Sequence, residues 1–138
     1  MLDPEAYKRL QEIGKGSYES IKEMVENLYA ARENDDPIEG DNATESILND
    51  ALSIEIRNNW HCPGGDSDPL EYKILLSWGG PAVQIIGTLN EYCEPNTAHL
   101  ETQDWFLPWT EQTDVEEKIL LDYAKILLDS AKCFYFGE

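Results

Sequence analysis

Residues 72–89, YKILLSWGGPAVQIIGTL, decide the fold that the sequence predicts. In each half of this stretch, apolar residues occupy every second position: Tyr72, Ile74, Leu76 and Trp78, then Val83, Ile85, Gly87 and Leu89. A period of two is typical of a strand with one buried and one solvated face. Because the glycines and the proline at 79–81 make a tight connection between the halves, the stretch predicts a β-hairpin.

Two further strands are predicted beside this hairpin. Before it, residues 52–57 alternate between apolar positions and Ser53, Glu55 and Arg57. After it, residues 97–105 are expected to form a fourth strand. Short connections favour an antiparallel meander, since parallel strands need long crossovers.

Helical spacing dominates the two ends of the chain. Asp3-Pro4-Glu5 has the cap, proline and acid of a helix start, and Gly14 is expected to end this first helix. Apolar residues from Ile21 to Tyr29 then recur every three or four positions and predict an amphipathic second helix. Thr113 and Glu116 have the spacing of a capping box for the last helix. The predicted fold class is α+β, a four-stranded antiparallel meander packed against N-terminal helices and a C-terminal helix.

A chain of 138 residues is about the size of one domain. We divide it into a helical segment at 1–32, a mobile acidic loop with a short helix at 33–50, and the sheet with its helix at 51–138. The apolar end, Cys133–Phe136, is expected to dock on the core or to add an edge strand.

Cysteine usage and hydropathy predict a cytoplasmic protein. The cysteines Cys62, Cys93 and Cys133 are odd in number and widely spaced, which fits reduced thiols better than a disulfide framework. The sequence has no apolar run as long as a membrane span and no signal-peptide pattern at its start.

The charge is the strongest compositional signal. Twenty-eight acids face ten Lys and Arg, a net charge of −18. From Glu33 to Ile56 there are eight acids and no Lys or Arg, and between Arg57 and Lys118 the sole Lys or Arg is Lys73. Such a field repels nucleic acid and anionic membranes and attracts basic proteins. The plainer interpretation is that it keeps a small protein in solution.

Two groups of residues are the candidates for contact with a basic partner. Acids would steer the encounter, and tryptophans would supply contact area with few rotatable bonds. The first group is Asp35, Asp36, Glu39, Asp41 and Glu45, and the second is Glu101, Asp104, Trp105, Trp109 and Glu111.

Signals for catalysis or metal binding are weak. His61 and Cys62 are adjacent, and adjacent side chains on an extended chain usually point apart. The histidines and cysteines lack the C-x₂-C and H-x₃-H spacings of zinc sites, and the sequence has neither a G-x-S-x-G motif nor a P-loop. We therefore predict no catalytic residue, cofactor or metal. An alternative is a small ligand- or metal-binding domain, or an enzyme, with its site near His61–Asp68 or Trp105.

From Leu52 onward the chain resembles a family of small acidic proteins of bacteriophages, prophages and plasmids. The resemblance rests on SWGGPAVQIIGTLNEYCEP (77–95), AHLETQDWFLPWTE (98–111) and CFYFGE (133–138). Its landmarks are Gly79, Gly80, Pro81, Gln103, Asp104, Trp105, Pro108, Trp109 and the segment Phe134–Glu138. The resemblance implies a protein of a mobile element that acts inside a bacterial cell. The family has no assigned enzymatic activity, so the resemblance does not supply a mechanism.

The sequence thus favours a non-enzymatic inhibitor of a host defence complex. By analogy with anti-CRISPR proteins that mimic DNA, its carboxylates would occupy the place of phosphates on a CRISPR effector or restriction enzyme. Such a protein binds neither nucleic acid nor membrane directly. A further alternative is a structural module that associates with itself through the open sheet face or a terminal strand.

Overall fold

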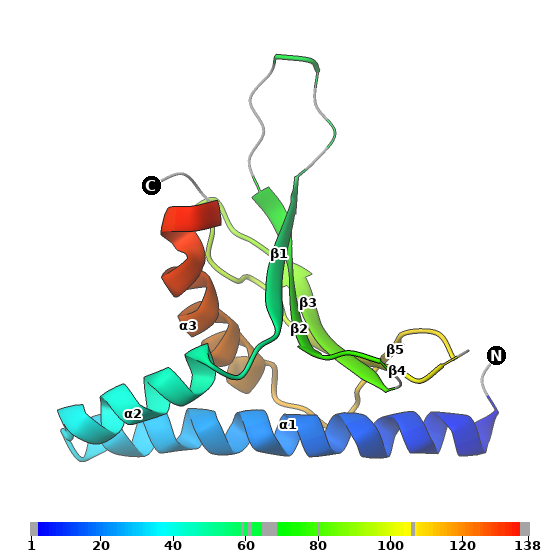
Figure 1. Cartoon of the computed structure of the whole chain (residues 1–138), viewed down its shortest axis with the longest axis horizontal. Coiled ribbons are helices and arrows are strands. Elements are labelled where there is room, and N and C mark those ends of the chain that lie inside the picture. Colours follow the sequence, from blue (N-terminus) through cyan, green and yellow to red (C-terminus); the bar gives the residue numbers. More distant parts are fainter. Residues whose placement is uncertain are drawn as a thin grey trace.

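A five-stranded antiparallel sheet packs against three helices in the computed structural model of the chain, which describes residues 3–58, 60, 62–64, 69–79, 81–105 and 107–135 (Figure 1). For Pro69 and residues 131–135 only the backbone is described. The helices are α1 (Pro4–Glu33), α2 (Pro37–Leu48) and α3 (Glu117–Tyr135). The strands are β1 (Ser53–Asn58), β2 (Pro69–Ser77), β3 (Ala82–Thr88), β4 (His99–Gln103) and β5 (Thr110–Glu111). The predicted α+β class is confirmed.

The sheet is a meander in the order β1-β2-β3-β4-β5, with every neighbouring pair antiparallel. The predicted hairpin is present as β2 and β3, with Ile74 opposite Ile85. The predicted number of four strands is wrong, because the chain returns after β4 to add β5 at the sheet edge. Two residues, Thr110 and Glu111, are too few to show an alternating pattern.

Alternation along the strands separates a buried face from an open one. Row by row, the register places Ile54, Ile74, Ile85 and Leu100 on the buried face. The neighbouring row on the open face is Glu55, Lys73, Ile86 and His99. Helices α1 and α3 contact the sheet, while α2 packs against both of these helices (Figure 1). The β1–β2 hairpin extends away from α1 (Figure 1).

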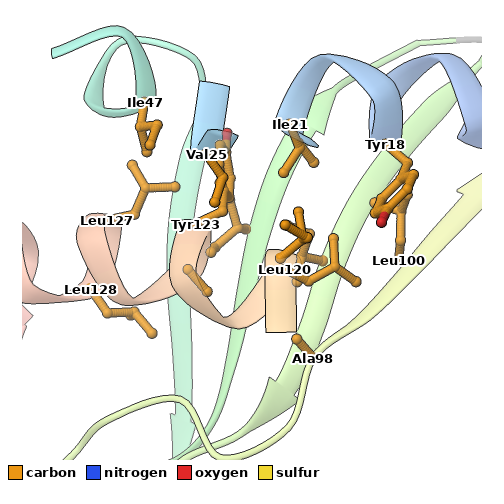
Figure 2. Close-up of a cluster of buried hydrophobic side chains, with 14 of the residues drawn as sticks. Tyr18, Ile21, Val25, Ile47, Ala98, Leu100, Leu120, Tyr123, Leu127 and Leu128 are labelled. Atoms are coloured by element: carbon orange, nitrogen blue, oxygen red, sulfur yellow. The ribbon is translucent and has the colours of Figure 1, made fainter. Parts of the chain in front are cut away.

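The hydrophobic core lies where α1, α2 and α3 meet the sheet (Figure 2). Its side chains come from widely separated segments: Tyr18, Ile21 and Val25 of α1, Ile47 of α2, Ala98 and Leu100 at β4, and Leu120, Tyr123, Leu127 and Leu128 of α3. All ten are nearly inaccessible to solvent, so each contributes about 1 to 3 kcal/mol through burial of apolar surface.

Helix α1 runs without a break from Pro4 to Glu33, so the prediction that Gly14 ends a first helix is wrong. Gly14 is buried where α1 crosses β4 and the segment after β5. A β-carbon placed on Gly14 would stand 2.0 Å from Oε1 of Gln112 and 2.8 Å from Oγ1 of Thr102. This glycine therefore permits the close approach of two elements, which its position in the sequence alone does not reveal.

The predicted mobile acidic loop is also wrong, because residues 37–48 form helix α2. Asp36 caps this helix by accepting the N–H of Glu39 at 3.1 Å, and Pro37 occupies the first helical position. Asp36-Pro37 is therefore a helix start. The short helix predicted within 33–50 extends from Pro37 to Leu48 and takes up most of that segment.

The last helix begins at Glu117, and the predicted capping box is not formed. The Thr113 hydroxyl donates to Oε1 of Gln11 at 3.1 Å, and the N–H of Glu116 donates to the Tyr18 hydroxyl at 3.0 Å. Contacts with α1 thus replace the local cap. Residues 133–135 belong to α3, so they form no edge strand, and residue 136 lies outside the described ranges.

The N-terminal half of α1 is held to the sheet by polar contacts. Nε2 of Gln11 donates to the Glu111 carbonyl at 2.9 Å, and Oε1 of Gln11 accepts from the backbone N–H and the hydroxyl of Thr113 at 3.0 and 3.1 Å. The Gln112 side chain returns a bond to the Gln11 carbonyl at 2.9 Å. We refer to these contacts between Gln11 and residues 111–113 as the glutamine clip.

Replacing Gln11 with alanine is expected to lower the free energy of unfolding by about 2 kcal/mol, because three side-chain hydrogen bonds are lost. The matched control is Glu12→Ala, an exposed position in the same turn of α1 where the effect should stay within about 0.5 kcal/mol. Urea unfolding measures both. Equal effects in the two variants would show that the clip does not contribute to stability.

Candidate functional site

The acids of the first predicted group lie together at one end of the molecule, where α1 turns into α2 (Figure 1). We call this region the acidic tip and define it by Glu33, Asp35, Asp36, Glu39, Asp41 and Glu45. Asp36 is half-buried and the other five are exposed. Six of the eight acids of the cation-free segment Glu33–Ile56 thus lie at this helical hairpin end, whereas Asp50 follows α2 and Glu55 lies in β1.

A short, well-bonded connection holds the acidic tip in place. Asp35 adopts the left-handed conformation with φ of 51°, which is more accessible to Asp than to most residues. The N–H groups of Asn34 and Asp36 donate to the carbonyls of Ala30 and Ala31 at 3.0 and 2.9 Å. Because Asp36 also caps α2, the carboxylates of α2 project from a helix rather than from a loop.

The acidic tip carries far more negative than positive charge, and Arg32, in the last turn of α1, lines the same hollow as Asp35 and Asp41. Helix α2 contains no Lys or Arg, and no ion pair within the described part of the chain includes an acid of the tip. Ile38, on the same helix, is 71% exposed and adds an apolar group among the carboxylates. The tip therefore combines an excess of negative charge with a small apolar contact, a combination suited to binding a basic protein surface.

A periodic row of glutamates leads along α1 to the tip, and sequence reasoning missed it. Glu5, Glu12, Glu19, Glu26 and Glu33 are seven residues apart and all exposed. In an α-helix this spacing keeps them on nearly one face, about 10 Å apart. The sevenfold spacing was the signal that could have revealed the row.

Lysines interrupt this row in the N-terminal two thirds of α1. Lys8, Lys15 and Lys22 follow the same period of seven, and Nζ of Lys15 lies 4.0 Å from Oε1 of Glu19. After Lys22 the exposed face continues with Glu26 and Glu33. The uncompensated part of the row therefore joins the acidic tip.

The second predicted group lies at the other end of α1 (Figure 1). Asp104 accepts from Nε of Arg9 at 3.1 Å, and its side chain is only 14% exposed. Since α1 rises 1.5 Å per residue, Arg9 and the acidic tip are about 40 Å apart. The structure does not bring the two predicted groups together.

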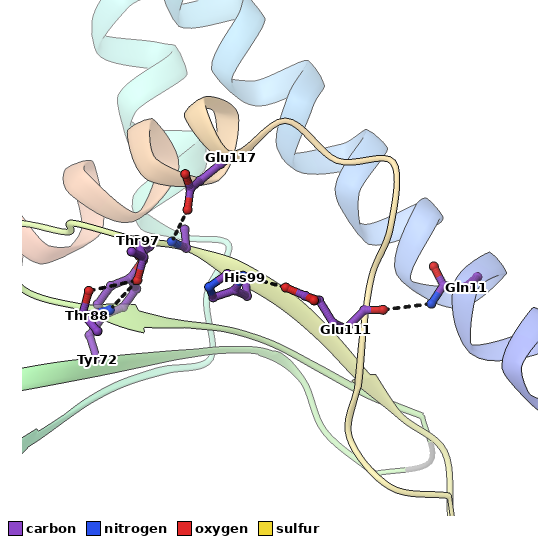
Figure 3. A network of polar contacts seen from close by, with 8 residues as sticks. Gln11, Tyr72, Thr88, Thr97, His99, Glu111 and Glu117 are labelled. Atoms are coloured by element: carbon purple, nitrogen blue, oxygen red, sulfur yellow. Dashed lines mark hydrogen bonds and ion pairs between the residues drawn. The ribbon is translucent and has the colours of Figure 1, made fainter. Parts of the chain in front are cut away.

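All three acids of the second group already bind a neighbouring side chain. Oε1 of Glu111 lies 2.6 Å from Nδ1 of His99, and the Glu111 carbonyl holds Gln11 (Figure 3). Glu101 accepts from Nε2 of Gln84 at 2.8 Å. These carboxylates therefore help to organise the open sheet face and the α1 contact, and they offer less free charge than the tip.

The two tryptophans of this group differ in exposure. Trp105 is 74% exposed and left-handed, with φ of 51°, whereas Trp109 is half-buried. A bulky residue in the left-handed region carries strain, and an exposed indole has little packing to offset it. Trp105 thus remains a candidate contact residue at a site separate from the acidic tip.

The open sheet face holds a shallow groove of about 400 Å³, whose lining side chains include Glu55, Arg57, Glu71, Lys73 and Gln84. Arg57 binds Glu71 with two nitrogens at 2.7 to 3.1 Å. Such paired charges can orient a polar ligand, but the groove lining contains no nucleophile beside a base.

The alternative site near His61–Asp68 lies largely outside the described residues, since residues 61 and 65–68 are not among them. Among the residues that are described, no group of three or more His, Cys, Asp or Glu side chains could hold a metal ion. Cys93 is a half-buried free thiol, and Cys62 is exposed. Within the same residues, no helix combines the length and the apolarity needed to cross a membrane.

Comparison with known proteins gave no match to a family model, to a curated protein or to a solved structure.

Proposed function

We propose that this protein belongs to a mobile element and acts as a non-enzymatic inhibitor inside the host cell. It binds a basic, nucleic-acid-handling host complex and blocks the access of that complex to nucleic acid. The observation that carries the proposal is the acidic tip: exposed carboxylates, held on a helical hairpin, that outnumber the one nearby cation, Arg32, and form no ion pair within the described residues. The partner class is a CRISPR effector or a restriction enzyme, whose nucleic-acid channels are lined by Lys and Arg.

Electrostatics supports this partner class. A channel that binds phosphates presents closely spaced cations, and carboxylates on a rigid helix can meet several of them at once. Such binding forms quickly, because the opposite fields steer the encounter, and it weakens as salt rises. Ile38 would supply apolar contact within the same surface. Trp105 and Trp109 would touch this complex only if it spans the length of α1.

Neutralising the acidic tip is expected to abolish partner capture from bacterial lysate at physiological salt. The variant carries Asp35→Asn, Glu39→Gln, Asp41→Asn and Glu45→Gln, and it keeps Asp36 because that side chain caps α2. The unmodified protein should retain proteins that also bind duplex DNA, and added DNA should displace them. A salt gradient should elute them at moderate ionic strength.

The matched control removes the same number of charges elsewhere, through Glu5→Gln, Glu12→Gln, Glu23→Gln and Glu91→Gln, all at exposed positions. If the tip is the binding surface, the control retains capture and a similar salt dependence. Equal losses in both variants would show that net charge alone is responsible. Unchanged capture by the tip variant would contradict the proposal.

A further inference from the structure

Strand β1 forms one edge of the sheet, and its outward side is formed by Ile54 and Ile56. Leu75 of β2 faces β1, because its carbonyl accepts the N–H of Leu52 at 2.8 Å. Its register partner is Ser53, so the odd-numbered residues of β1 bond to β2. The even-numbered residues Ile54 and Ile56 therefore turn their backbone N–H and C=O groups away from β2.

Within the described residues no strand stands beside Ile54 and Ile56, since β1 is first in the strand order. An unpaired edge is a template for another strand unless the protein protects it. Here the side chains alternate between half-buried Ile54 and Ile56 and exposed Ser53, Glu55 and Arg57. The exposed charges, Glu55 and Arg57, have opposite signs and stand on either side of Ile56.

We propose that β1 pairs antiparallel with β1 of a second copy of this chain, about a two-fold axis at Ile56. A strand that meets its own copy must be self-complementary about the axis. In this register Ile56 pairs with Ile56 of the second copy through the outward backbone groups. Glu55 of each copy then stands opposite Arg57 of the other, in the closer type of antiparallel pair.

An axis at Ile54 sets Ser53 opposite Glu55 and forms no Glu–Arg pair. Axes at the two charged residues are disfavoured by charge. An axis at Glu55 sets the two Glu55 side chains opposite each other, and an axis at Arg57 does the same for the arginines. Like charges directly opposite one another destabilise a sheet. Arg57 already binds Glu71 through Nε and Nη2, so its remaining nitrogen, Nη1, can reach Glu55 of the second copy.

Two exposed apolar residues flank β1. Leu52 precedes the strand and is 61% exposed, and Trp60 follows it and is 99% exposed. The dimer would thus form one continuous ten-stranded sheet from two five-stranded sheets. At physiological ionic strength the Debye length is about 8 Å, which screens much of the repulsion between two acidic copies.

Charge exchange across the axis tests the proposal. Glu55→Arg places two arginines opposite each other, and Arg57→Glu places two glutamates opposite each other, so each variant alone should dimerise roughly tenfold more weakly or worse. Mixing the two variants restores Arg–Glu pairs at both positions and should yield a heterodimer about as strong as the parent dimer. Sedimentation equilibrium of the full chain measures the dissociation constants.

Lys15→Glu is the matched control for Arg57→Glu, because it makes the same charge change at an exposed position of α1, away from the edge. It should leave the dissociation constant nearly unchanged. A parent protein that stays monomeric at every concentration overturns the proposal, as does a mixture of the variants that forms no heterodimer although circular dichroism shows both to be folded.

A second measurement needs no substitution. In the unmodified protein, hydrogen exchange at the amides of Ile54 and Ile56 should slow as protein concentration rises, whereas the amides of Glu55 and Arg57 are protected by β2 at all concentrations. Exchange at Ile54 and Ile56 that is independent of concentration would contradict pairing at this edge.

Discussion

Replacing Gly87 with alanine is expected to destabilise the protein by about 3 kcal/mol. A β-carbon on Gly87 would stand 1.9 Å from the carbonyl oxygen of Thr97 and 2.7 Å from the hydroxyl of Tyr72. Both atoms belong to one hydrogen bond of 2.6 Å (Figure 3). The obstacle is backbone, so no side-chain rotation can relieve the contact, and the segment carrying Thr97 must move.

That movement has further costs. The Thr97 hydroxyl accepts the N–H of Thr88 at 2.9 Å and also bonds the Thr88 hydroxyl (Figure 3). Asn96 donates its N–H to the Thr88 carbonyl at 2.8 Å. Displacing residues 96–97 strains or breaks these bonds as well, which leaves polar groups without partners.

The control is Gly16→Ala. Gly16 lies in the middle of α1, and a β-carbon there meets no atom within 4 Å. Alanine is a better helix former than glycine by about 0.5 to 1 kcal/mol, so this variant should be more stable than the parent. Thermal unfolding of both variants gives the comparison. A Gly87→Ala protein as stable as the parent would show that Thr97 does not lie over β3 in solution.

Alkaline pH is expected to destabilise the protein steeply above pH 10. Burial raises the pKa of Tyr72 well above its ordinary value near 10, and the negative charge of Glu117 raises it further. Burial likewise raises the pKa of Tyr123, as does its hydrogen bond of 2.6 Å to Asp50. In the unfolded chain both phenols lose their protons near pH 10, whereas the folded protein retains them.

The sign follows from proton binding. Above pH 10 the folded state holds more protons than the unfolded state, so the free energy of unfolding falls as pH rises. Each tyrosine contributes about 1.4 kcal/mol per pH unit, and the pair contributes about 2.7. Their stabilising contribution is fully present below pH 10 and is lost progressively above it, up to the raised folded-state pKa.

Denaturant unfolding between pH 9 and pH 11 measures this slope. Tyr72→Phe and Tyr123→Phe each remove one titrating group and should each reduce the slope by about 1.4 kcal/mol per pH unit, independently of their effect on stability at neutral pH. A slope that does not change in either variant would mean that the phenols titrate alike in the folded and unfolded states.

The sheet could be predicted because its two faces have different environments. Ile74 and Ile85 are buried while Lys73 is exposed, so alternation in the sequence records the pleat directly. The β5 strand could not be predicted, because Thr110 and Glu111 form a strand through pairing with β4 rather than through a local pattern.

The helices were harder to delimit because local signals have more than one meaning. Glycine often ends helices, yet Gly14 lies inside α1 and leaves room for the side chain of Gln112. Asp36-Pro37 resembles a loop, yet it caps α2. In both cases the deciding fact is which neighbour the residue meets, and a single sequence does not contain it.

In the candidate site, too, the local charge pattern could be predicted and the tertiary contacts could not. Segregation of charge along the chain was enough to predict an acidic surface near Asp35 and Glu45. It could not predict that Asp104 is neutralised by Arg9, a residue 95 positions earlier in the chain. It also could not predict that the two acidic groups occupy opposite ends of α1, because distance in space depends on an unbroken helix.

The glutamine clip has a consequence for synthesis on the ribosome. Gln112, which donates to the Gln11 carbonyl, follows Gln11 by 101 residues. Glu116, whose N–H donates to the Tyr18 hydroxyl, follows Tyr18 by 98 residues. Chains emerge at about 5 to 20 residues per second, so α1 leaves the exit tunnel several seconds before its partners exist. During that interval α2 is the one element already made that can cover part of its apolar stripe. The nascent chain therefore exposes part of the apolar face of α1 until β4 and α3 have been synthesised.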